Sequence, residues 1–287
     1  KHYPQVELLL LDKNYGYAEG YNRALEQVAA DCYVLLNSDV EVEEGWLGPL
    51  AKLMASDERI AALAPKILSY DRPGYFEYAG ASGGFLDAFG YPFCRGRILD
   101  TIEQDDGQYD TSRDVFWASG ACMMVRADVF RKLGGFDGDF FAHMEEIDFC
   151  WRAQLAGYRI MVEPRSRVFH LGGGTLPNNS PRKLYLNYRN NLSMLYKNLS
   201  KLTLWPLLFT RMVLDGMSAF VFLMQGRRDF FKVVFRSHMD FYKILGMLRA
   251  KRRAIQRDRT GSAAGNIYRG SIILRHALGR RTFGRMM

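Results

Sequence analysis

The sequence predicts an α/β fold in which a mostly parallel sheet is flanked by helices and followed by an α-helical region. Two observations indicate this fold. Apolar runs typical of buried strands alternate with stretches of helical periodicity through the first two-thirds of the chain. Beyond Pro181 the pattern is helical and contains few helix-breaking residues. We therefore expect an α/β domain over residues 1–180 and a helical, basic region over residues 181–287.

The first strands and helices alternate along the chain. Residues 6–11 form a nearly continuous apolar run and residues 32–36 form a second one, as expected of strands buried on both faces. Apolar residues at helical spacing follow these runs over residues 18–30 and 44–56, and a third strand is expected over residues 61–67. Strands and helices in this order indicate a parallel sheet with helices on both faces.

Residues 69–113 have a different character. Glycine, tyrosine, phenylalanine and aspartate dominate them, and no period persists. We expect a long excursion that contains a hairpin, and such excursions in compact domains often carry function. Regular elements return with a strand at 115–125 and helices at 127–133 and 145–156, and a last core strand is expected at 159–162.

The charge is distributed unevenly along the chain. Residues 201–287 carry 18 Lys and Arg against 4 Asp and Glu, whereas residues 1–200 carry 21 against 27. A basic segment of this kind attracts anionic lipid headgroups or nucleic acid, or is simply a solvated face. The four cysteines are scattered without a CxxC pair, which is typical of reduced thiols in a cytosolic protein and argues against a thiolate metal site.

The basic tail favours a membrane surface over nucleic acid. Residues 202–224 are its most apolar stretch, and two charges near the centre, Arg211 and Asp215, argue against a membrane-spanning helix. An interfacial amphipathic helix fits better, because a basic, Phe-rich segment follows over residues 230–248. We expect peripheral contact with an anionic membrane surface and no nucleic-acid binding. A helical appendage packed on the domain, or on the second subunit of a homodimer, stays an alternative.

Acidic side chains gather at the ends of two expected elements. Asp39 ends a buried strand, where α/β sheets bind ligands and where a carboxylate can hold a cation between phosphates. A turn or helix cap is the plainer interpretation of that residue. Glu145, Glu146 and Asp148 crowd the first turn of a helix, which is more than the helix dipole requires. Like charges held so close raise at least one pKa, which suits a general base for a hydroxyl.

Two glycine-containing segments add further candidates. His170 precedes three glycines, which suits a metal ligand beside a loop that covers phosphate, although a lone histidine is most often structural. Residues 14–22 form a turn of Gly and Asn that leads into a helix. A helix start offers free N–H groups to phosphate or hydroxyl oxygens. A plain loop-to-helix junction is the alternative for this segment.

Four motifs occur along the chain: the turn at residues 14–22, the strand end at Asp39, the acidic cluster at residues 145–148, and His170 with its glycines. Together and in this chain order they resemble family 2 glycosyltransferases, which are inverting enzymes with a GT-A fold. The resemblance covers residues 6–199 and is closest to bacterial rhamnosyltransferase-like proteins that decorate surface polysaccharides. The family pattern N-x-G-[FY]-[AG]-x-[GA]-x-N is met by Asn14, Gly16, Tyr17, Ala18, Gly20 and Asn22. The aspartate-x-aspartate motif appears in the relaxed form Asn37-Ser38-Asp39. The acceptor-side motif appears as Glu145-Glu146, followed by Asp148, Trp151 and Arg152.

The resemblance implies a role for each of these residues. Asp39 and His170 would hold Mg²⁺ or Mn²⁺ against the donor diphosphate. Glu146 would take the proton of the acceptor hydroxyl, with Glu145 as its near-equal rival and Asp148 in the same catalytic group. The other donor-binding residues would be Asn14, Gly16, Tyr17, Gly20, Asn22, Asn37 and Arg152. The acceptor side would include Trp117, Gly120 and Trp151, with Trp117 stacking on a sugar face.

The implied function is metal-assisted transfer of a hexosyl or rhamnosyl group from a nucleotide sugar to a glycan or lipid-linked acceptor, in the cytoplasm at the inner face of the cell membrane. The family's first strand and its following Asp-bearing strand are not found, so we expect the chain to be N-terminally incomplete. That expectation motivates an alternative, a non-catalytic, membrane-peripheral interaction protein derived from such an enzyme. A nucleotidyltransferase that makes the sugar nucleotide shares the sheet pattern and stays a third alternative.

Overall fold

The centre of the molecule is a six-stranded sheet with the strand order β1-β9-β3-β10-β2, in which β8 pairs with the first half of β10. The computed structural model describes residues 3–172 and 180–286 of the chain. The strands of this sheet are β1 (Cys32–Leu36), β2 (Val40–Val42), β3 (Ile60–Ser69), β8 (Arg113–Asp114), β9 (Cys122–Arg126) and β10 (Arg159–His170).

The sheet is mixed in direction. Within the described part of the chain, β3 and β10 are its one directly paired parallel couple. β9 runs antiparallel between β1 and β3, and β2 and β8 run antiparallel to β10. The predicted α/β class is confirmed, but the pairing differs from the mostly parallel arrangement that the sequence predicts, because β9 enters between β1 and β3 from the opposite end. β1, β3 and β10 still point the same way, so their carboxyl ends lie at the same end of the sheet.

Helices cover both faces of this sheet, as the apolar strands predict. Neighbouring residues of β3 point to opposite faces: Leu63 packs with Leu50 of α2, whereas Ala62 lies in the core that contains Phe149 of α4. Burial on both faces explains why β3 is an almost unbroken apolar run. The helices of this part are α1 (Gly16–Leu25), α2 (Leu47–Ser56), α3 (Ala127–Lys132) and α4 (Glu145–Leu155).

The predicted first strand, over residues 6–11, is wrong in this structure. These residues adopt no regular element, and Leu8 and Leu10 are 77% and 82% exposed. A strand must pair its backbone N–H and C=O groups with a neighbour. Among the described residues, β1 pairs with β9 alone. The apolar run therefore lies on the surface and not in the sheet.

Residues 69–113 build most of a second, smaller sheet with the strand order β11-β4-β5-β6-β7. The predicted hairpin is confirmed, since β4 and β5 pair antiparallel. β11 comes from the far end of the chain and pairs in parallel with β4. The C-terminal residues therefore help to build this sheet. Its strands are β4 (Gly84–Asp87), β5 (Pro92–Cys94), β6 (Arg97–Ile98), β7 (Thr101–Ile102) and β11 (Ile267–Tyr268).

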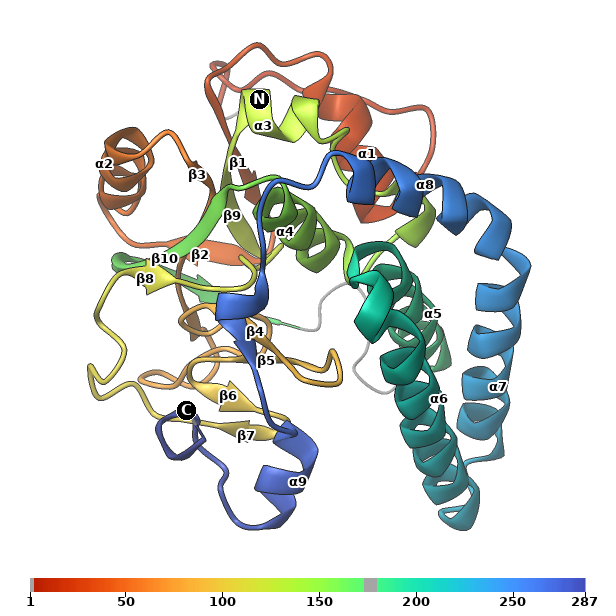
Figure 1. The fold of residues 1–287 in the computed structure, drawn as a ribbon. Helices are drawn as coiled ribbons and strands as arrows, with labels where there is room; N and C mark the ends of the chain where they lie inside the picture. Colours follow the sequence, from red (N-terminus) through yellow and green to blue (C-terminus); the bar gives the residue numbers. More distant parts are fainter. Residues whose placement is uncertain (1–2, 173–179, 287) are drawn as a thin grey trace.

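The C-terminal region is helical, as predicted. Serine caps begin its first two helices: Ser180 Oγ accepts from the Lys183 N–H, and Ser200 Oγ accepts from the Thr203 N–H. Figure 1 shows α6 and α7 lying side by side and extending away from the main sheet, while α5 lies next to α4. These helices are α5 (Pro181–Asn198), α6 (Lys201–Met224), α7 (Arg228–Lys243), α8 (Leu245–Arg257) and α9 (Ile272–Ala277).

Candidate active site

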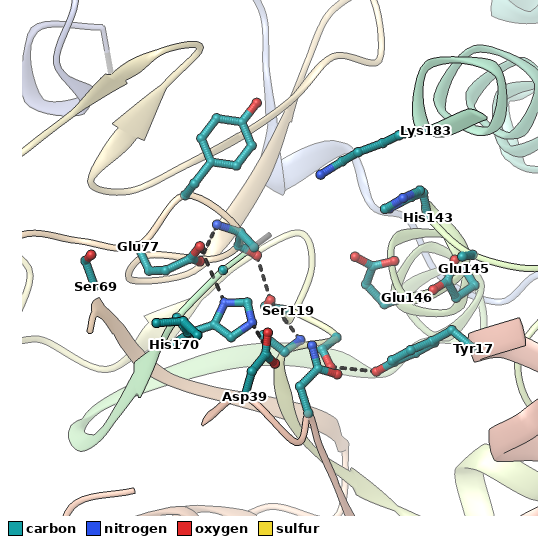
Figure 2. Close-up of a pocket in the computed structure, with 18 of the residues that line it drawn as sticks. Tyr17, Asp39, Ser69, Glu77, Ser119, His143, Glu145, Glu146, His170 and Lys183 are labelled. Carbon is teal, nitrogen blue, oxygen red and sulfur yellow. Dashed lines mark hydrogen bonds and ion pairs between the residues drawn. The ribbon is translucent and has the colours of Figure 1, made fainter. Parts of the chain in front are cut away.

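A cavity of about 680 Å³ opens at the carboxyl ends of β1, β3 and β10. Asn37 follows β1, Ser69 ends β3 and His170 ends β10, and all three line the cavity. Figure 2 shows Asp39, Glu77 and His170 on one side of the cavity and Glu145 and Glu146 on the other. The predicted site residues that line it are Asn14, Gly16, Tyr17, Asn37, Asp39, Gly120, Glu145, Glu146 and His170. The fold thus brings the four sequence motifs to one space.

His170 lies between two carboxylates. Its Nε2 is 3.3 Å from Asp39 Oδ1, and its Nδ1 is 3.4 Å from Glu77 Oε1 (Figure 2). Glu77 is held in place because its other carboxylate oxygen accepts from the Ala79 N–H. Burial alone would lower the pKa of His170, but the charges of Glu77 and Asp39 outweigh it and raise that pKa above its ordinary value. The imidazole and the Asp39 carboxylate are therefore fixed side by side in the cavity wall.

The residues present fit the divalent cation that the resemblance implies. Both ring nitrogens of His170 are buried, and within the described chain neither has a well-aligned hydrogen-bond partner. Asp39 Oδ1 and His170 Nε2 are 3.3 Å apart, close to the spacing of about 3 Å between adjacent ligands of an octahedral Mg²⁺ or Mn²⁺ site. The residues described include no cluster of three or more such ligands. Substrate phosphates and water would complete the shell, as is usual for Mg²⁺.

Glu145 and Glu146 begin α4 and line the cavity opposite His170 (Figure 2). One carboxylate oxygen of each is buried with no hydrogen-bond partner among the described residues. Burial raises the pKa of Glu146 to about 7, against the opposing effect of N–H groups at the helix start. Burial, and then the charge of Glu146, raise the pKa of Glu145 well above its usual range. Both carboxyl groups therefore hold their protons to higher pH than an exposed glutamate does, and the pKa of Glu146 suits proton transfer near neutral pH.

The backbone of the loop before α4 is strained, and hydrogen bonds from α5 hold it in place. Three of its non-glycine residues have φ between 64° and 74°, which costs about 1–3 kcal/mol each. These residues are Phe141, His143 and Met144. The side-chain amide of Asn190, a fully buried residue of α5, donates to three carbonyls of this loop at 2.8–3.0 Å. α5 therefore fixes the backbone that directs the two glutamates, a role that the sequence patterns do not predict.

The start of α1 does not offer free N–H groups to a phosphate. The N–H groups of Tyr17 and Ala18 both donate to the carbonyl of Phe141, at 2.7 and 3.3 Å. The predicted phosphate contact through these groups is therefore wrong. Gly16 has a φ of 78°, and a Cβ there would lie 2.5 Å from the same carbonyl, which explains the glycine. The hydroxyl of Tyr17 donates to Gly120 O at 2.6 Å, so α1, the loop before α4 and the Gly120 segment are joined.

Two members of the α1 motif lie outside the cavity. Asn22 fastens α1 to Phe136: its amide nitrogen donates to the Phe136 carbonyl and its oxygen accepts from the Phe136 N–H, both at 2.9 Å. Gly20 is not among the residues that line the cavity. The donor contacts predicted for Asn22 and Gly20 are therefore wrong in this structure. The Asn22 amide is occupied by hydrogen bonds to Phe136, and Gly20 does not reach the cavity. Gly172 lines the cavity after His170, whereas Gly173 and Gly174 lie outside the described residues.

Asp148 and Arg152 are buried braces and do not reach the cavity. Arg152 Nε donates to Asp148 Oδ2 at 2.8 Å, and its other nitrogens donate to the carbonyls of Leu133 and Gly135 at 2.7 Å. Lys197 Nζ lies 3.0 Å from Asp148 Oδ2. The catalytic role predicted for Asp148 and the donor contact predicted for Arg152 are wrong, because the two side chains neutralise each other inside the core.

The two predicted acceptor-side tryptophans are core residues. Trp117 and Trp151 are each 3% exposed. The Trp117 indole N–H donates to Phe85 O at 3.0 Å, and the Trp151 ring packs edge-on against Phe116 with centroids 5.2 Å apart. A ring enclosed on both faces cannot stack on a sugar. The sugar contacts predicted for Trp117 and Trp151 are therefore wrong, and Gly120 alone of the three acceptor-side residues lines the cavity.

Among the residues of the cavity wall that the sequence patterns missed are Glu77, Tyr78, His143, Arg182 and Lys183. Glu77 and Tyr78 lie in the irregular stretch, where no period separates site residues from packing residues. Burial, and then the charge of Lys183, lower the pKa of His143 to about 4, so this ring is neutral at pH 7. Arg182 and Lys183 begin α5, where cations run against the helix dipole. That mismatch is a signal that could have pointed to an anionic ligand.

The chain matches the model of glycosyl transferase family 2 over residues 1–134. It is 28% identical over 184 residues to the N-acetylglucosaminyl-diphospho-decaprenol L-rhamnosyltransferase of Mycobacterium tuberculosis, which covers 59% of this chain and 60% of that protein. It is 29% identical over 163 residues to rhamnosyltransferase WbbL of Escherichia coli, which covers 54% of this chain and 61% of that protein. The chain thus spans about 60% of the length of these curated relatives.

A solved structure of TarS from S. aureus, in complex with UDP-GlcNAc, has a similar fold. The TM-score is 0.50, the sequence identity is 13%, and the match covers 95% of this chain and 75% of TarS. At this identity the likeness concerns the fold, which is of the GT-A type. The family-model match over residues 1–134, the curated relatives and the motifs gathered around one cavity make this chain similar to glycosyl transferase family 2.

Proposed function

We propose that this chain is an inverting glycosyltransferase of cell-surface polysaccharide synthesis, which moves a hexosyl or rhamnosyl group from a nucleotide sugar to a hydroxyl of a glycan or lipid-linked acceptor. One observation carries the proposal: a single cavity holds the Asp39–His170 pair on one side and the Glu145–Glu146 pair on the other (Figure 2). Its volume of about 680 Å³ suits a small-molecule substrate. The names of the curated relatives support a rhamnosyl donor and a lipid-linked acceptor.

Glu146 is the residue we assign as the general base. The acceptor hydroxyl oxygen bonds to the anomeric carbon, its proton passes to the Glu146 carboxylate, and the bond from that carbon to the diphosphate oxygen breaks. Attack from the face opposite the leaving diphosphate inverts the anomeric centre. A carboxylate whose pKa is raised to about 7 is matched to proton transfer near neutral pH. Burial and the neighbouring charge of Glu146 raise the pKa of Glu145 well above its usual range, so we assign Glu145 a supporting role beside the base.

Asp39 and His170 are suited to hold Mg²⁺ or Mn²⁺ against the donor diphosphate. Their oxygen and nitrogen atoms are 3.3 Å apart, and Glu77 contacts the other ring nitrogen, as carboxylates do when they orient a ligand histidine. The bound cation supplies positive charge that offsets the charge developing on the leaving diphosphate. Arg182 and Lys183 add two cationic side chains to the cavity wall, which also favours an anionic donor.

Calorimetry of nucleoside diphosphate binding tests the donor side. We expect UDP, dTDP or GDP to bind the wild-type protein in the presence of Mn²⁺, and we expect Asp39→Ala to weaken that binding by about tenfold or more. Asp31→Ala is the matched control, because Asp31 is exposed and lies outside the cavity. Equal binding by Asp39→Ala and the wild type would refute the metal role of Asp39. Failure of all three nucleotides to bind the wild type would refute the donor site itself.

We further propose that the protein works in the cytoplasm at the inner face of the cell membrane and contacts it through α6 and α7. One side of α6 is apolar and uncovered: Trp205, Phe209 and Phe220 are 63%, 72% and 58% exposed and recur at helical spacing. The two charges near the centre of this helix, Arg211 and Asp215, pair at 2.8 Å and are buried away from that stripe. In the sequence these two charges argue against a membrane-spanning helix, whereas in the structure they form an ion pair inside the protein.

Positive charge complements this apolar stripe. α7 exposes Phe235 beside Arg228, Lys232 and Arg236. Anionic headgroups attract such residues by about 1 kcal/mol each near the surface. α6 is long and apolar enough to cross a bilayer by length and composition. Its pairing with α7 and its buried ion pair favour a position in the plane of the interface. A second copy of the chain, as in a homodimer, is the alternative occupant of this face.

A further inference from the structure

Tyr78 is an aromatic residue of the cavity wall with one covered face and one open face. It lines the cavity and is 46% exposed. On its covered side the guanidinium Cζ of Arg97 lies 4.3 Å from the ring centroid. Arg97 itself is only 6% exposed, so the exposed part of Tyr78 belongs to the side that the guanidinium does not cover. The part of Tyr78 that the guanidinium leaves uncovered is thus available to the cavity that this residue lines.

The surroundings of Tyr78 hold the ring in this position. Beneath the ring, Arg97 donates to Leu99 O at 3.4 Å and to Cys94 Sγ at 3.5 Å. The neighbours of Tyr78 in the chain are fixed as well. The Ala79 N–H donates to the Glu77 carboxylate, whose opposite oxygen contacts His170, and the Ala79 carbonyl accepts from Ser119 Oγ at 2.6 Å. A binding surface whose supports are locked in this way loses little entropy when a ligand docks.

We propose that Tyr78 is a stacking platform for a pyranose ring in this cavity, an inference that rests on the proposed function. The face of an aromatic ring is electron-rich, and the Arg97 cation already occupies one face. The other face is available to the apolar C–H face of a sugar, whose hydroxyls remain free for the polar cavity wall. The pyranose is either the donor sugar or the acceptor sugar, because both rings must enter this cavity. The platform takes the place of Trp117, which the core encloses.

Steady-state kinetics of Tyr78→Ala and Tyr78→Phe test the platform. The probes are UDP-, dTDP- and GDP-sugars with Mn²⁺, with water or a methyl glycopyranoside as the acceptor. We expect Tyr78→Ala to raise KM about tenfold for one pyranose-bearing substrate, and we expect Tyr78→Phe to keep the wild-type KM. Tyr70→Ala is the matched control, because Tyr70 is 52% exposed and lies outside the cavity. A raised KM in donor hydrolysis assigns the donor sugar, and a raised KM for the methyl glycoside alone assigns the acceptor sugar.

The inhibition constant of the free nucleoside diphosphate separates this inference from its rival. A sugar platform leaves the inhibition constants of UDP, dTDP and GDP unchanged in Tyr78→Ala. A matching rise in those constants would overturn the inference and make Tyr78 a nucleobase contact. Unchanged KM values for all substrates would also overturn it, while leaving the transferase proposal intact. Inactivity of the wild-type protein with every donor would instead count against the proposed function.

Discussion

Glu145 and Glu146 are adjacent in sequence, and the fold perturbs the pKa of both carboxyl groups. Both begin α4 beside the cavity, and burial raises the pKa of each. The charge of Glu146 adds to the effect of burial on Glu145. Because both pKa values are raised above the ordinary 4.5, the folded state holds protons that the unfolded state releases, and stability falls as pH rises from 4.5 through about 7. The raised pKa values of the two glutamates therefore lower the free energy of unfolding near neutral pH.

The pH dependence of turnover follows from the Glu146 pKa. Only the ionised carboxylate can accept the hydroxyl proton, so kcat should fall about tenfold per pH unit below 7 and level off above it. A rate profile between pH 4 and 9, at saturating donor and Mn²⁺, checks this. The wild type is its own control for folding if circular dichroism is followed over the same range. A midpoint near 4.5, the value of an exposed glutamate, would contradict the assignment.

At the scale of elements, α5 joins the catalytic loop to the C-terminal helices. Asn190 holds the strained loop before α4 through three backbone carbonyls. Lys197, also on α5, pairs with Asp148 of α4 at 3.0 Å and with Asp137 in the turn that precedes the loop. Lys251 of α8 pairs with the same Asp137. The helical region therefore helps to position Glu145 and Glu146, besides carrying the exposed face of α6 and α7.

The exposed face of α6 and α7 gives a prediction for membrane binding. The wild-type protein should co-float with vesicles that contain phosphatidylglycerol and bind less to pure phosphatidylcholine vesicles, because apolar burial and positive charge act together. Replacing Trp205, Phe209 and Phe220 by serine should abolish co-flotation without unfolding, since all three are exposed. Tyr70→Ser, a change at an exposed aromatic elsewhere, is the matched control.

Two outcomes of the vesicle experiment would contradict the membrane proposal. Undiminished co-flotation of the triple serine variant would show that another surface binds the lipid. The other contradicting outcome has two parts. The wild type does not bind vesicles, and the triple serine variant has a lower sedimentation coefficient than the wild type. That result would assign the α6–α7 face to a second copy of the chain. Raised salt should weaken wild-type binding, because headgroup attraction is screened over about 8–10 Å at 0.1–0.15 M salt.

At the scale of the whole molecule, the α/β part and the C-terminal segment of the chain pack together in one structure. After α8 the chain returns to the second sheet, where β11 pairs with β4. Phe283 then packs against Phe85, Tyr109 and Phe93, with ring centroids 5.2, 5.7 and 6.1 Å apart. The acidic first part and the basic tail therefore share a core, although the sequence suggests two regions of different character.

The elements that the sequence predicts well are those with several turns or a long apolar run. α4 is predicted at residues 145–156 and spans Glu145–Leu155, and β3 is predicted at 61–67 and spans Ile60–Ser69. β11 has two residues and pairs with a strand far away in the sequence, so no local period can reveal it. Residues 6–11 have the composition of a strand, but composition does not supply the neighbour that a strand must pair with.

The candidate site is predictable where a residue type at a strand or helix end implies chemistry. Asp39, Glu146 and His170 are found in this way, and the structure brings them to one cavity. Aromatic residues are harder, because the same side chain fills a core or stacks on a ligand: Trp117 is enclosed, whereas Tyr78 is half exposed. Glu77 gains its place from tertiary contacts with His170, which no sequence spacing reports.

Nucleotide-sugar turnover by Glu146→Gln and Glu145→Gln tests the central claim most directly. With Mn²⁺ and a panel of nucleotide sugars, the wild type should release a nucleoside diphosphate. Glu146→Gln should lose about 10²–10⁴-fold in turnover while it still binds the nucleotide. Glu145→Gln should stay within a few-fold of the wild type, because glutamine keeps the size and hydrogen-bonding capacity of a residue to which we assign no proton transfer. Wild-type turnover by Glu146→Gln, or loss of turnover in Glu145→Gln alone, would contradict the account.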